Sequence, residues 1–427
     1  MADQPFSVSR LRIEIVVDAH TALINDVSFT KSSIRPPGGQ EIAVTTATRH
    51  SGDRVFSVSD ADLFVVVSPG YTIDPRTIAA VEHTFATDAE IDLMFGPESA
   101  ASPRPGWHPE RLRSHDYLGG LVALRGSLGR KLVGLAGDRY PYHRWDLVLR
   151  AGELARAVAI SDHPLAIRSK PSVAPMNPET TRRGRQVLHD HLSRMDIRAL
   201  AEATRSPGYF RTRRVLSTRP KVSVLIASPS ASHATIDDHL DALCEVVGSI
   251  VENSTYQPLE IIVVTDDSIP SAALHRVREL CEGAVEVLPV CRPASPRSRH
   301  LEIAASLATG EVFVILDDTC VVEDDPEWLE TLVALAIDPS IGAACSVPDD
   351  SPFTPGGDDA PIQAETAIIA GACIAIRREV MTEIGGIGDD STGVAVPAAL
   401  ADHGWACIRT PFVRLRRHRA DRPLATT

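Results

Sequence analysis

Long apolar runs alternate with helix-spaced apolar residues through the second half of the chain. Residues 222–227 and 259–264 are almost continuously apolar, as expected of strands buried on both faces of a sheet. Between them, residues 240–250 carry apolar side chains at helical spacing, after a predicted capping box at Thr235 and Asp238. Further elements follow in the same alternation: a helix through 274–280, a strand near 285–288, a helix through 301–307, a strand at 312–316 and a helix from Pro326. The pattern predicts a mostly parallel sheet with helices on both faces.

Two pairs of acidic residues follow directly after predicted strands. Asp266-Asp267 comes after the second strand and Asp317-Asp318 after the fourth. In parallel sheets, ligands bind beyond the carboxyl ends of the strands, so both pairs are expected at one edge. A carboxylate in an apolar setting is costly unless it is paired or metal-bound. The arrangement favours a ligand site over an ordinary polar turn, which is the alternative.

The first half repeats the order of the second at an offset of about 250 residues. Residues 64–70 resemble 313–319 in their order of apolar and other residues, and residues 119–125 resemble 371–377 in the same way. Such self-similarity predicts two copies of one fold. The interval from the opening strand at 12–17 to the strand that begins at 64 is about half as long as the matching interval, from 222 to 312, in the second copy. We therefore expect the first copy to lack its early helix, its second strand and the acidic turn after that strand.

These observations divide the chain into four parts: a degenerate first copy at residues 1–168, a linker with a helix at 169–220, a complete second copy at 221–420 and a tail at 421–427. The linker is rich in Arg, Pro and Ser. Its helix, expected around residues 186–195, is predicted to be solvated. The linker is therefore expected to separate the two copies.

Composition excludes several classes of protein. Apolar residues make up 44% and charged residues 23% of 427 positions, which is typical of a globular chain. The net charge of −13 argues against a nucleic-acid binder, because neutralising phosphates requires an excess of Lys and Arg. The seven cysteines form no CxxC pair, which argues against a zinc knuckle.

The sequence shows no sign of secretion or membrane crossing. Residues 1–5 lack the basic and then apolar profile of a signal peptide, and no run of about 18 apolar residues is present. The cysteine pattern suits a reducing compartment, so a cytoplasmic location is expected. The arginines within residues 409–422 are expected to form a solvated terminus, and peripheral contact with an anionic membrane or with acceptor phosphates is the alternative.

The order of these motifs resembles that of a known family. Residues 221–418 resemble family 2 glycosyltransferases with the GT-A fold. The resemblance is carried by residues 222–226, 260–268, 308–311, 315–318, 370–378 and Gly385-Gly386. Residues 61–168 resemble the same family, and the whole chain is similar to tandem bacterial members. The implied fold class is α/β, with two GT-A domains in tandem (Rossmann-like, nucleotide-diphospho-sugar transferase), the first truncated.

The resemblance implies transfer of a sugar from a nucleotide-diphosphate sugar to an acceptor hydroxyl, generally with inversion. The implied acceptor is a glycan or a lipid-linked molecule, and a partner glycosyltransferase is a further expected contact. No nucleic acid is expected to bind.

The resemblance also assigns roles to the acids at the predicted edge. Asp266 or Asp267 holds the nucleoside, and Asp317 contributes to binding the nucleotide sugar. Asp317 and Asp318 bind the cofactor, Mg²⁺ or Mn²⁺, which bridges the diphosphate and neutralises the leaving group. His418 matches a histidine that in some members contacts the metal or the diphosphate, and a surface histidine is the alternative.

A carboxylate base is implied as well, because the acceptor hydroxyl loses its proton as it attacks. At the family's base position this chain has Thr and Gly, residues 392–393, which accept no proton at neutral pH. Asp389 and Asp390 lie just before them and are the expected catalytic residues if the loop is re-aimed. In the first copy, Ser-Pro-Gly at 68–70 and His-Arg at 143–144 fill the metal and base positions, so neither role is expected there.

The alternative function is that of a catalytically inactive homologue that binds a partner enzyme or a glycan as a scaffold. Thr319 stands where the family usually has its metal-coordinating Asp, and the base position is vacant. The shortened first copy favours the same interpretation. An unrelated nucleotide-binding domain is disfavoured, because the sequence has no glycine-rich phosphate loop.

Overall fold

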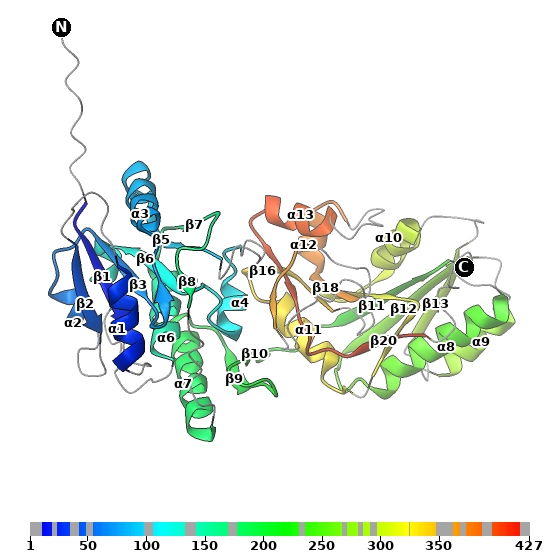
Figure 1. Cartoon of the computed structure of the whole chain (residues 1–427). Coiled ribbons are helices and arrows are strands. Elements are labelled where there is room, and N and C mark those ends of the chain that lie inside the picture. The colour runs from blue at the N-terminus through cyan, green and yellow to red at the C-terminus, as the bar shows by residue number, and fades with distance from the viewer. Residues whose placement is uncertain are drawn as a thin grey trace, which may run out of the picture. The chain divides into compact units, whose positions relative to one another are not determined.

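The chain forms two compact units, Met1–Thr212 and Arg213–Thr427. The computed structural model describes residues 11–18, 24–34, 42–47, 54–97, 106–132, 142–169, 177–229, 235–266, 271–280, 285–290, 297–323, 325–346, 362–367, 373–386 and 395–418. Each unit combines a mixed sheet with helices, so the predicted α/β class is confirmed (Figure 1). Within the described ranges, no helix combines the length and the apolar character that a membrane crossing requires.

The second unit is built on an eight-stranded sheet in the order β13-β12-β11-β14-β18-β16-β19-β17. Its strands are β11 (Val222–Ser228), β12 (Leu259–Asp266), β13 (Val285–Val290), β14 (Val312–Asp317), β16 (Ile341–Ser346), β17 (Ala364–Glu365), β18 (Cys373–Arg377) and β19 (Ala406–Arg409). The first four are parallel to one another, and β18 runs antiparallel between β14 and β16. A separate antiparallel pair joins β15 (Cys320–Val322) and β20 (Leu415–Arg417).

Helices cover both faces of this sheet. They are α8 (Ile236–Glu252), α9 (Ser271–Glu279), α10 (Arg297–Leu307), α11 (Trp328–Ala336), α12 (Arg378–Glu383) and α13 (Ala395–Asp402). Val222, Val224 and Ile226 of β11 pack with α8, α9 and α11, whereas Leu225 and Ala227 pack with α10, α12 and α13 (Figure 1). The alternate side chains of one strand therefore enter two different cores, as the continuous apolar run predicted.

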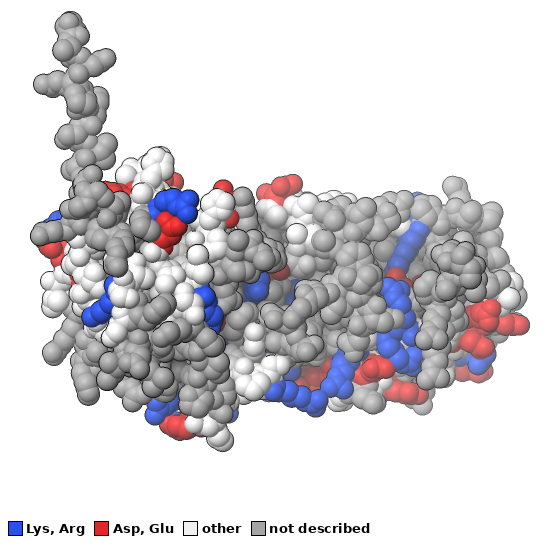
Figure 2. Space-filling view, in the orientation of Figure 1, with Lys and Arg blue, Asp and Glu red and all other residues white. Residues whose placement is uncertain are grey.

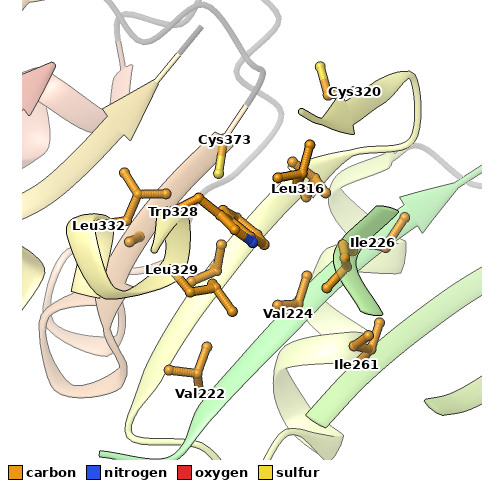
Figure 3. Close-up of a cluster of buried hydrophobic side chains, with 14 of the residues drawn as sticks. Val222, Val224, Ile226, Ile261, Leu316, Cys320, Trp328, Leu329, Leu332 and Cys373 are labelled. Carbon is orange, nitrogen blue, oxygen red and sulfur yellow. The ribbon is translucent and has the colours of Figure 1, made fainter. Parts of the chain in front are cut away.

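Trp328 on α11 closes the first of these cores. Its side chain is completely buried and lies among Val224, Leu316 and Leu329 (Figure 3). The indole Nε1 donates a hydrogen bond to Ser254 Oγ at 2.9 Å, so the single polar atom of the ring is satisfied. Leu316 directly precedes Asp317, and this packing therefore fixes the end of β14 that carries the acidic pair.

The first unit has a six-stranded sheet in the order β2-β1-β3-β6-β5-β7. Its strands are β1 (Ile13–Asp18), β2 (Ala43–Ala47), β3 (Leu63–Val67), β5 (Ile91–Phe95), β6 (Leu121–Arg125) and β7 (Ala157–Ile160). Its helices are α1 (Ile24–Ser33), α2 (Arg54–Ser57), α3 (Pro75–Thr87), α4 (Pro109–Ser114), α5 (Gly126–Gly129), α6 (His143–Leu154) and α7 (Pro178–Arg194). Two small antiparallel pairs complete the unit: β4 (Tyr71–Thr72) with β8 (Ile167–Arg168), and β9 (Ala199–Ala203) with β10 (Phe210–Arg214).

The two units share a strand order and a set of strand directions. β2-β1-β3-β6-β5-β7 of the first unit has the same parallel and antiparallel neighbours as β12-β11-β14-β18-β16-β19 of the second. The small pairs correspond as well, because Ser169 N donates to Gly70 O at 3.0 Å and His418 N donates to Thr319 O at 2.7 Å. The internal order predicted from sequence thus has a structural equivalent in both halves.

One expectation for the first half is wrong. The early helix and the second strand, predicted to be missing, are present as α1 and β2, and β2 is parallel to β1. The described part of the first unit shows no equivalent of β13, and α2 has 4 residues where α10 has 11. β2 lacks an apolar run because it is an edge strand, in which Val44 is exposed and Thr45 and Thr46 are half-buried. The turn predicted after it falls at residues outside the described ranges.

The predicted linker, residues 169–220, contains the division between the units, but its helix is not solvated. α7 starts earlier than expected, at Pro178, with a capping box formed by Asn177 and Thr180. Val187, Leu188 and Leu192 of α7 are buried in a core of the first unit. The Arg-rich composition hid these apolar positions, which recur on one side of the helix.

Charged residues of both signs lie on the surface of the described ranges. Figure 2 shows basic and acidic residues on both units. Many of them are paired on the surface, such as Arg299 with Glu302 and Arg276 with Asp241. Part of the surface charge of the described residues is therefore balanced by neighbours of opposite sign.

Glu260, near the start of β12, joins three segments of the second unit. Its carboxylate accepts hydrogen bonds from Ser223 Oγ at 2.5 Å, Thr309 N at 2.6 Å and Thr309 Oγ1 at 2.7 Å. It also lies 2.7 Å from Lys221 Nζ. Burial alone would raise the pKa of Glu260, but these partners lower it to about 2.

We expect Glu260→Gln to destabilise the second unit by about 1–3 kcal/mol at neutral pH, because a charge-assisted network is lost. The folded pKa lies below the ordinary value of 4.5, so this stabilisation is complete above pH 4.5 and disappears as the pH falls towards 2. Urea unfolding of both proteins between pH 7 and pH 3 measures the difference. Exposed Glu302→Gln serves as the matched control with little expected effect. A Glu260→Gln penalty that does not shrink on acidification would contradict this account.

Candidate functional site

The carboxyl ends of β12, β11 and β14 lie side by side at one edge of the second sheet. In register, Ser228 of β11 stands opposite Thr265 of β12, and Ala227 stands opposite Asp317 of β14. Asp266 follows Thr265 directly, so Asp266 and Asp317 flank the end of β11. The two acidic turns therefore meet at the same edge, as the alternation of strands and helices predicted.

A single helix holds both of these acids. α10 packs against β11 and β12. Arg297 and His300 in its first turn are three residues apart and therefore lie on the same side of the helix. Arg297 Nη1 donates to Asp317 Oδ2, and His300 Nε2 lies 3.0 Å from Asp266 Oδ1. Side chains of α10 thus contact both carboxylates.

Asp266 is a buried acid with a buried partner. Its residue is 2% exposed, and His300 is completely buried. Burial without such a partner would carry a large desolvation cost. Asp267, the second residue predicted to bind the nucleoside, lies outside the described residues.

Both carboxylate oxygens of Asp317 accept hydrogen bonds from neighbouring residues. Its Oδ1 accepts from Thr319 N at 3.0 Å and Thr319 Oγ1 at 2.6 Å, while Oδ2 accepts from Arg297. Burial would raise the pKa of Asp317, but the charge of Arg297 and the hydrogen bonds of Thr319 lower it below its usual range. The acid is therefore ionised at neutral pH and forms a close ion pair with Arg297.

Asp318 faces the interior of the unit. The residue is 4% exposed, and its Oδ2 accepts a hydrogen bond from Ser228 Oγ at 2.8 Å. The same hydroxyl lies 2.5 Å from Nε2 of the buried His239 on α8. The three side chains connect the end of β14, the end of β11 and the first turns of α8, so they fix the shape of the edge.

His418 lies beside the acidic turn but points its ring towards α8. Its Nδ1 is hydrogen-bonded to Glu245, which also pairs with Arg416. The ring is largely buried, with 15% of the side chain exposed, so it is not the surface histidine considered as the alternative. The bond to Thr319 O is made by the main-chain nitrogen of His418.

The remaining predictions concern residues that the structure does not assemble. Asp389 and Asp390, the expected catalytic acids, lie outside the described residues. Within the part of the chain that is described, no three or more His, Cys, Asp or Glu side chains are arranged to hold a metal ion. The roles of Asp317, Asp318 and His418 as metal ligands therefore stay predictions.

Sequence reasoning missed four residues of this edge: Ser228, His239, Arg297 and His300. The run Arg297-Ser298-Arg299-His300 precedes the apolar positions of α10, and its polar residues three apart were the available signal. Ser228 and His239 carried no such signal, because their contact spans two elements.

The equivalent edge of the first unit has different chemistry. Ser68, after β3, stands where β14 ends in Asp317. At the end of β1, Asp18 lies 3.7 Å from Nδ1 of His143, the first residue of α6. Both residues are buried, so this edge places a histidine against a carboxylate among the unit's own side chains.

Two curated proteins match most of the chain at low identity. An O-antigen biosynthesis protein of Myxococcus xanthus is 23% identical over 95% of this chain and 34% of its own length. An uncharacterized protein of Sinorhizobium fredii is 24% identical over 84% of this chain and 42% of its own length. The chain therefore spans less than half the length of these relatives.

Among solved structures, a mannosyltransferase from Pyrobaculum calidifontis in complex with GDP-Man and Mn²⁺ is 22% identical. The similarity covers 48% of this chain and 59% of that chain, with a TM-score of 0.39. A structure of GalNAc-T7 with UDP, GalNAc and Mn²⁺ is 18% identical, covering 49% of this chain and 45% of that chain at a TM-score of 0.38. Both TM-scores are too low to assign a ligand or an activity to this chain.

The family comparison coincides with the site. Residues 237–385 match the glycosyl transferase family 2 model. This span includes β12, β14 and α10, and therefore Asp266, Asp317 and the two side chains that hold them. The second unit thus carries a domain that matches glycosyl transferase family 2.

Proposed function

We propose that the second unit binds a nucleotide-diphosphate sugar at the edge formed by Asp266 and Asp317 and transfers the sugar to an acceptor hydroxyl. The observation that carries this proposal is the placement of both acids beside the end of β11. Both acids also lie within residues 237–385, the span that matches the family. Both are oriented by α10 before any ligand binds. Such pre-organisation favours binding, because little side-chain freedom is lost.

Asp266 is the proposed nucleoside ligand, together with Asp267. A carboxylate accepts hydrogen bonds from a ribose hydroxyl or from an N–H of the base. His300 acts as a positioning residue, because its ring fixes one oxygen of Asp266.

Divalent Mg²⁺ or Mn²⁺ was expected from the resemblance, with Asp317, Asp318 and His418 as ligands. Mg²⁺ is usually bound through one or two carboxylates and the substrate phosphates. The described side chains fit such an ion poorly, because Asp317 is bound to Arg297, Asp318 to Ser228 and His418 to Glu245. No step of the proposed reaction is therefore assigned to a bound ion.

The proposed transfer is an inverting displacement. The acceptor oxygen forms a bond to the anomeric carbon, the bond from that carbon to the diphosphate oxygen breaks, and the nucleoside diphosphate leaves. A base takes the acceptor proton as the attack proceeds. We assign this task to Asp389 or Asp390. A glycan or lipid-linked acceptor is supported by the name of the Myxococcus xanthus relative.

We also propose that the two units are copies of the GT-A fold and that the first no longer transfers sugar. The shared strand order and the equivalent main-chain bonds of Ser169 and His418 support the duplication. Ser68 in place of a carboxylate, and the buried contact of Asp18 with His143, support the loss of activity. The first unit would then serve as a platform for the acceptor or for a partner glycosyltransferase.

An inactive, scaffolding homologue is the second candidate. It is favoured by the ion pair with Arg297, which neutralises the acid that was expected to hold the metal. An inactive homologue would bind partners or glycans without turning over a donor. Donor hydrolysis and transfer therefore separate the two functions.

Asp266→Asn tests the proposed nucleotide site. We expect about 10- to 100-fold weaker binding of the preferred nucleotide sugar, because hydrogen bonds to a charged acceptor are lost. Calorimetric titration with a panel of nucleotide sugars, combined with an assay of donor hydrolysis, measures binding and turnover. Exposed Asp241→Asn on α8 is the matched control and should bind as the wild type does. If the wild type binds no donor, the scaffold function replaces this one.

His300→Ala tests the positioning role. Nucleotide affinity should fall about tenfold, and His300→Gln, which retains a donor, should recover most of the loss. The acceptor KM should stay unchanged in both variants, because the hydrogen bond of His300 is made to Asp266, the proposed nucleoside ligand. Thermal unfolding reports any change in stability separately. Equal nucleotide affinities for wild type and His300→Ala would show that Asp266 needs no such support.

A further inference from the structure

Arg297, a cation of the chain itself, stands beside the acidic pair. Arg297 pairs with Asp317, and the charge of Asp318 also acts on its guanidinium. The Arg297 side chain is 33% exposed and that of Asp317 16%, so the arginine is the more accessible member of the pair. A positive charge therefore already stands beside the carboxylate to which a divalent ion was expected to bind.

The coordination of Asp317 leaves little room for a metal ion. A carboxylate offers about two lone pairs on each oxygen. Thr319 uses Oδ1 twice, and Arg297 uses Oδ2 once. An ion on the remaining position of Oδ2 would lie next to the guanidinium, and two positive charges at contact distance repel strongly. Metal binding at this carboxylate thus requires Arg297 to move away.

The guanidinium has the properties needed to bind a diphosphate. It is planar and carries five N–H donors, and phosphate oxygens accept such donors in pairs. The bond to Asp317 is made by a single nitrogen, Nη1. Burial would lower the pKa of Arg297, but Asp317 raises it, so the side chain stays charged throughout the accessible pH range.

Asp317 also fixes where this charge sits. The acid is held by Thr319 in a tight turn, and Arg297 is held by Asp317 at the start of α10. The amide groups of a first helical turn add a partial positive charge at the same place. Arg297 is therefore oriented before a ligand arrives, which a surface arginine is not.

We propose that Arg297 is the cation of the nucleotide site, and that it binds the diphosphate directly so that nucleotide binding needs no divalent metal. This inference rests on the proposed function, because it names the group that recognises the diphosphate at the same edge. Asp317 is then a positioning residue for Arg297 rather than a metal ligand. The deviation of Thr319 from the family pattern has the same explanation, since its side chain helps to hold Asp317.

Calorimetric titration with UDP and with GDP, each in EDTA and in MnCl₂, tests this inference. Wild-type protein should bind its preferred nucleoside diphosphate with equal affinity in both solutions. Arg297→Gln should bind about 10- to 100-fold more weakly in EDTA, because a charged hydrogen-bond donor is lost. Arg297→Lys should recover part of the loss. Arg299→Gln, an exposed change on the same helix, should bind as the wild type does.

The double variant Arg297→Gln with Asp317→Asn controls for loss of stability. It removes both charges of the pair, so no buried charge is left without its partner. It should unfold at a temperature close to that of the wild type and still fail to bind tightly in EDTA. Wild-type binding that appears only with Mn²⁺, or unchanged binding of Arg297→Gln in EDTA, would overturn the inference and leave the proposed function intact. Binding of no nucleotide under either condition would overturn both.

Discussion

The desolvation of carboxylates at the ends of buried strands is the constraint on which the second unit depends. Residues 261–264 of β12 and 312–316 of β14 are apolar, and both strands then end in acids that are largely removed from water. Such groups are tolerated only when donors meet them. α10 supplies those donors from one turn, and the turn at Thr319 supplies the rest. The contacts that make these buried acids tolerable in the fold are therefore the same contacts that shape the candidate site.

The alternation of apolar residues was sufficient to predict the centre of each sheet. β11, β12 and β14 are buried on both faces, and such strands leave continuous apolar runs in the sequence. The edges of the fold were harder to predict. β2 is partly exposed and carries threonines, and α7 presents its few apolar residues among arginines. In both elements, tertiary packing outweighs a weak local signal.

The candidate site was predictable in position but not in its contacts. Asp266 and Asp317 follow strands, and strand order alone brings them to one edge. The direction of a side chain after a strand ends is not set by the alternation, so the inward turn of Asp318 towards Ser228 could not be deduced. Arg297 likewise reaches Asp317 across 20 positions of sequence. Partners of this kind appear only when the elements are packed.

The residue after β8 in the first unit and the residue after β20 in the second each donate a main-chain hydrogen bond to the turn that follows a central strand. Every residue except proline has the amide group that makes this bond. Replacement of the histidine in one unit by the serine of the other therefore leaves the loop anchored. The side chain at this position can therefore change without loss of the main-chain bond that anchors the loop.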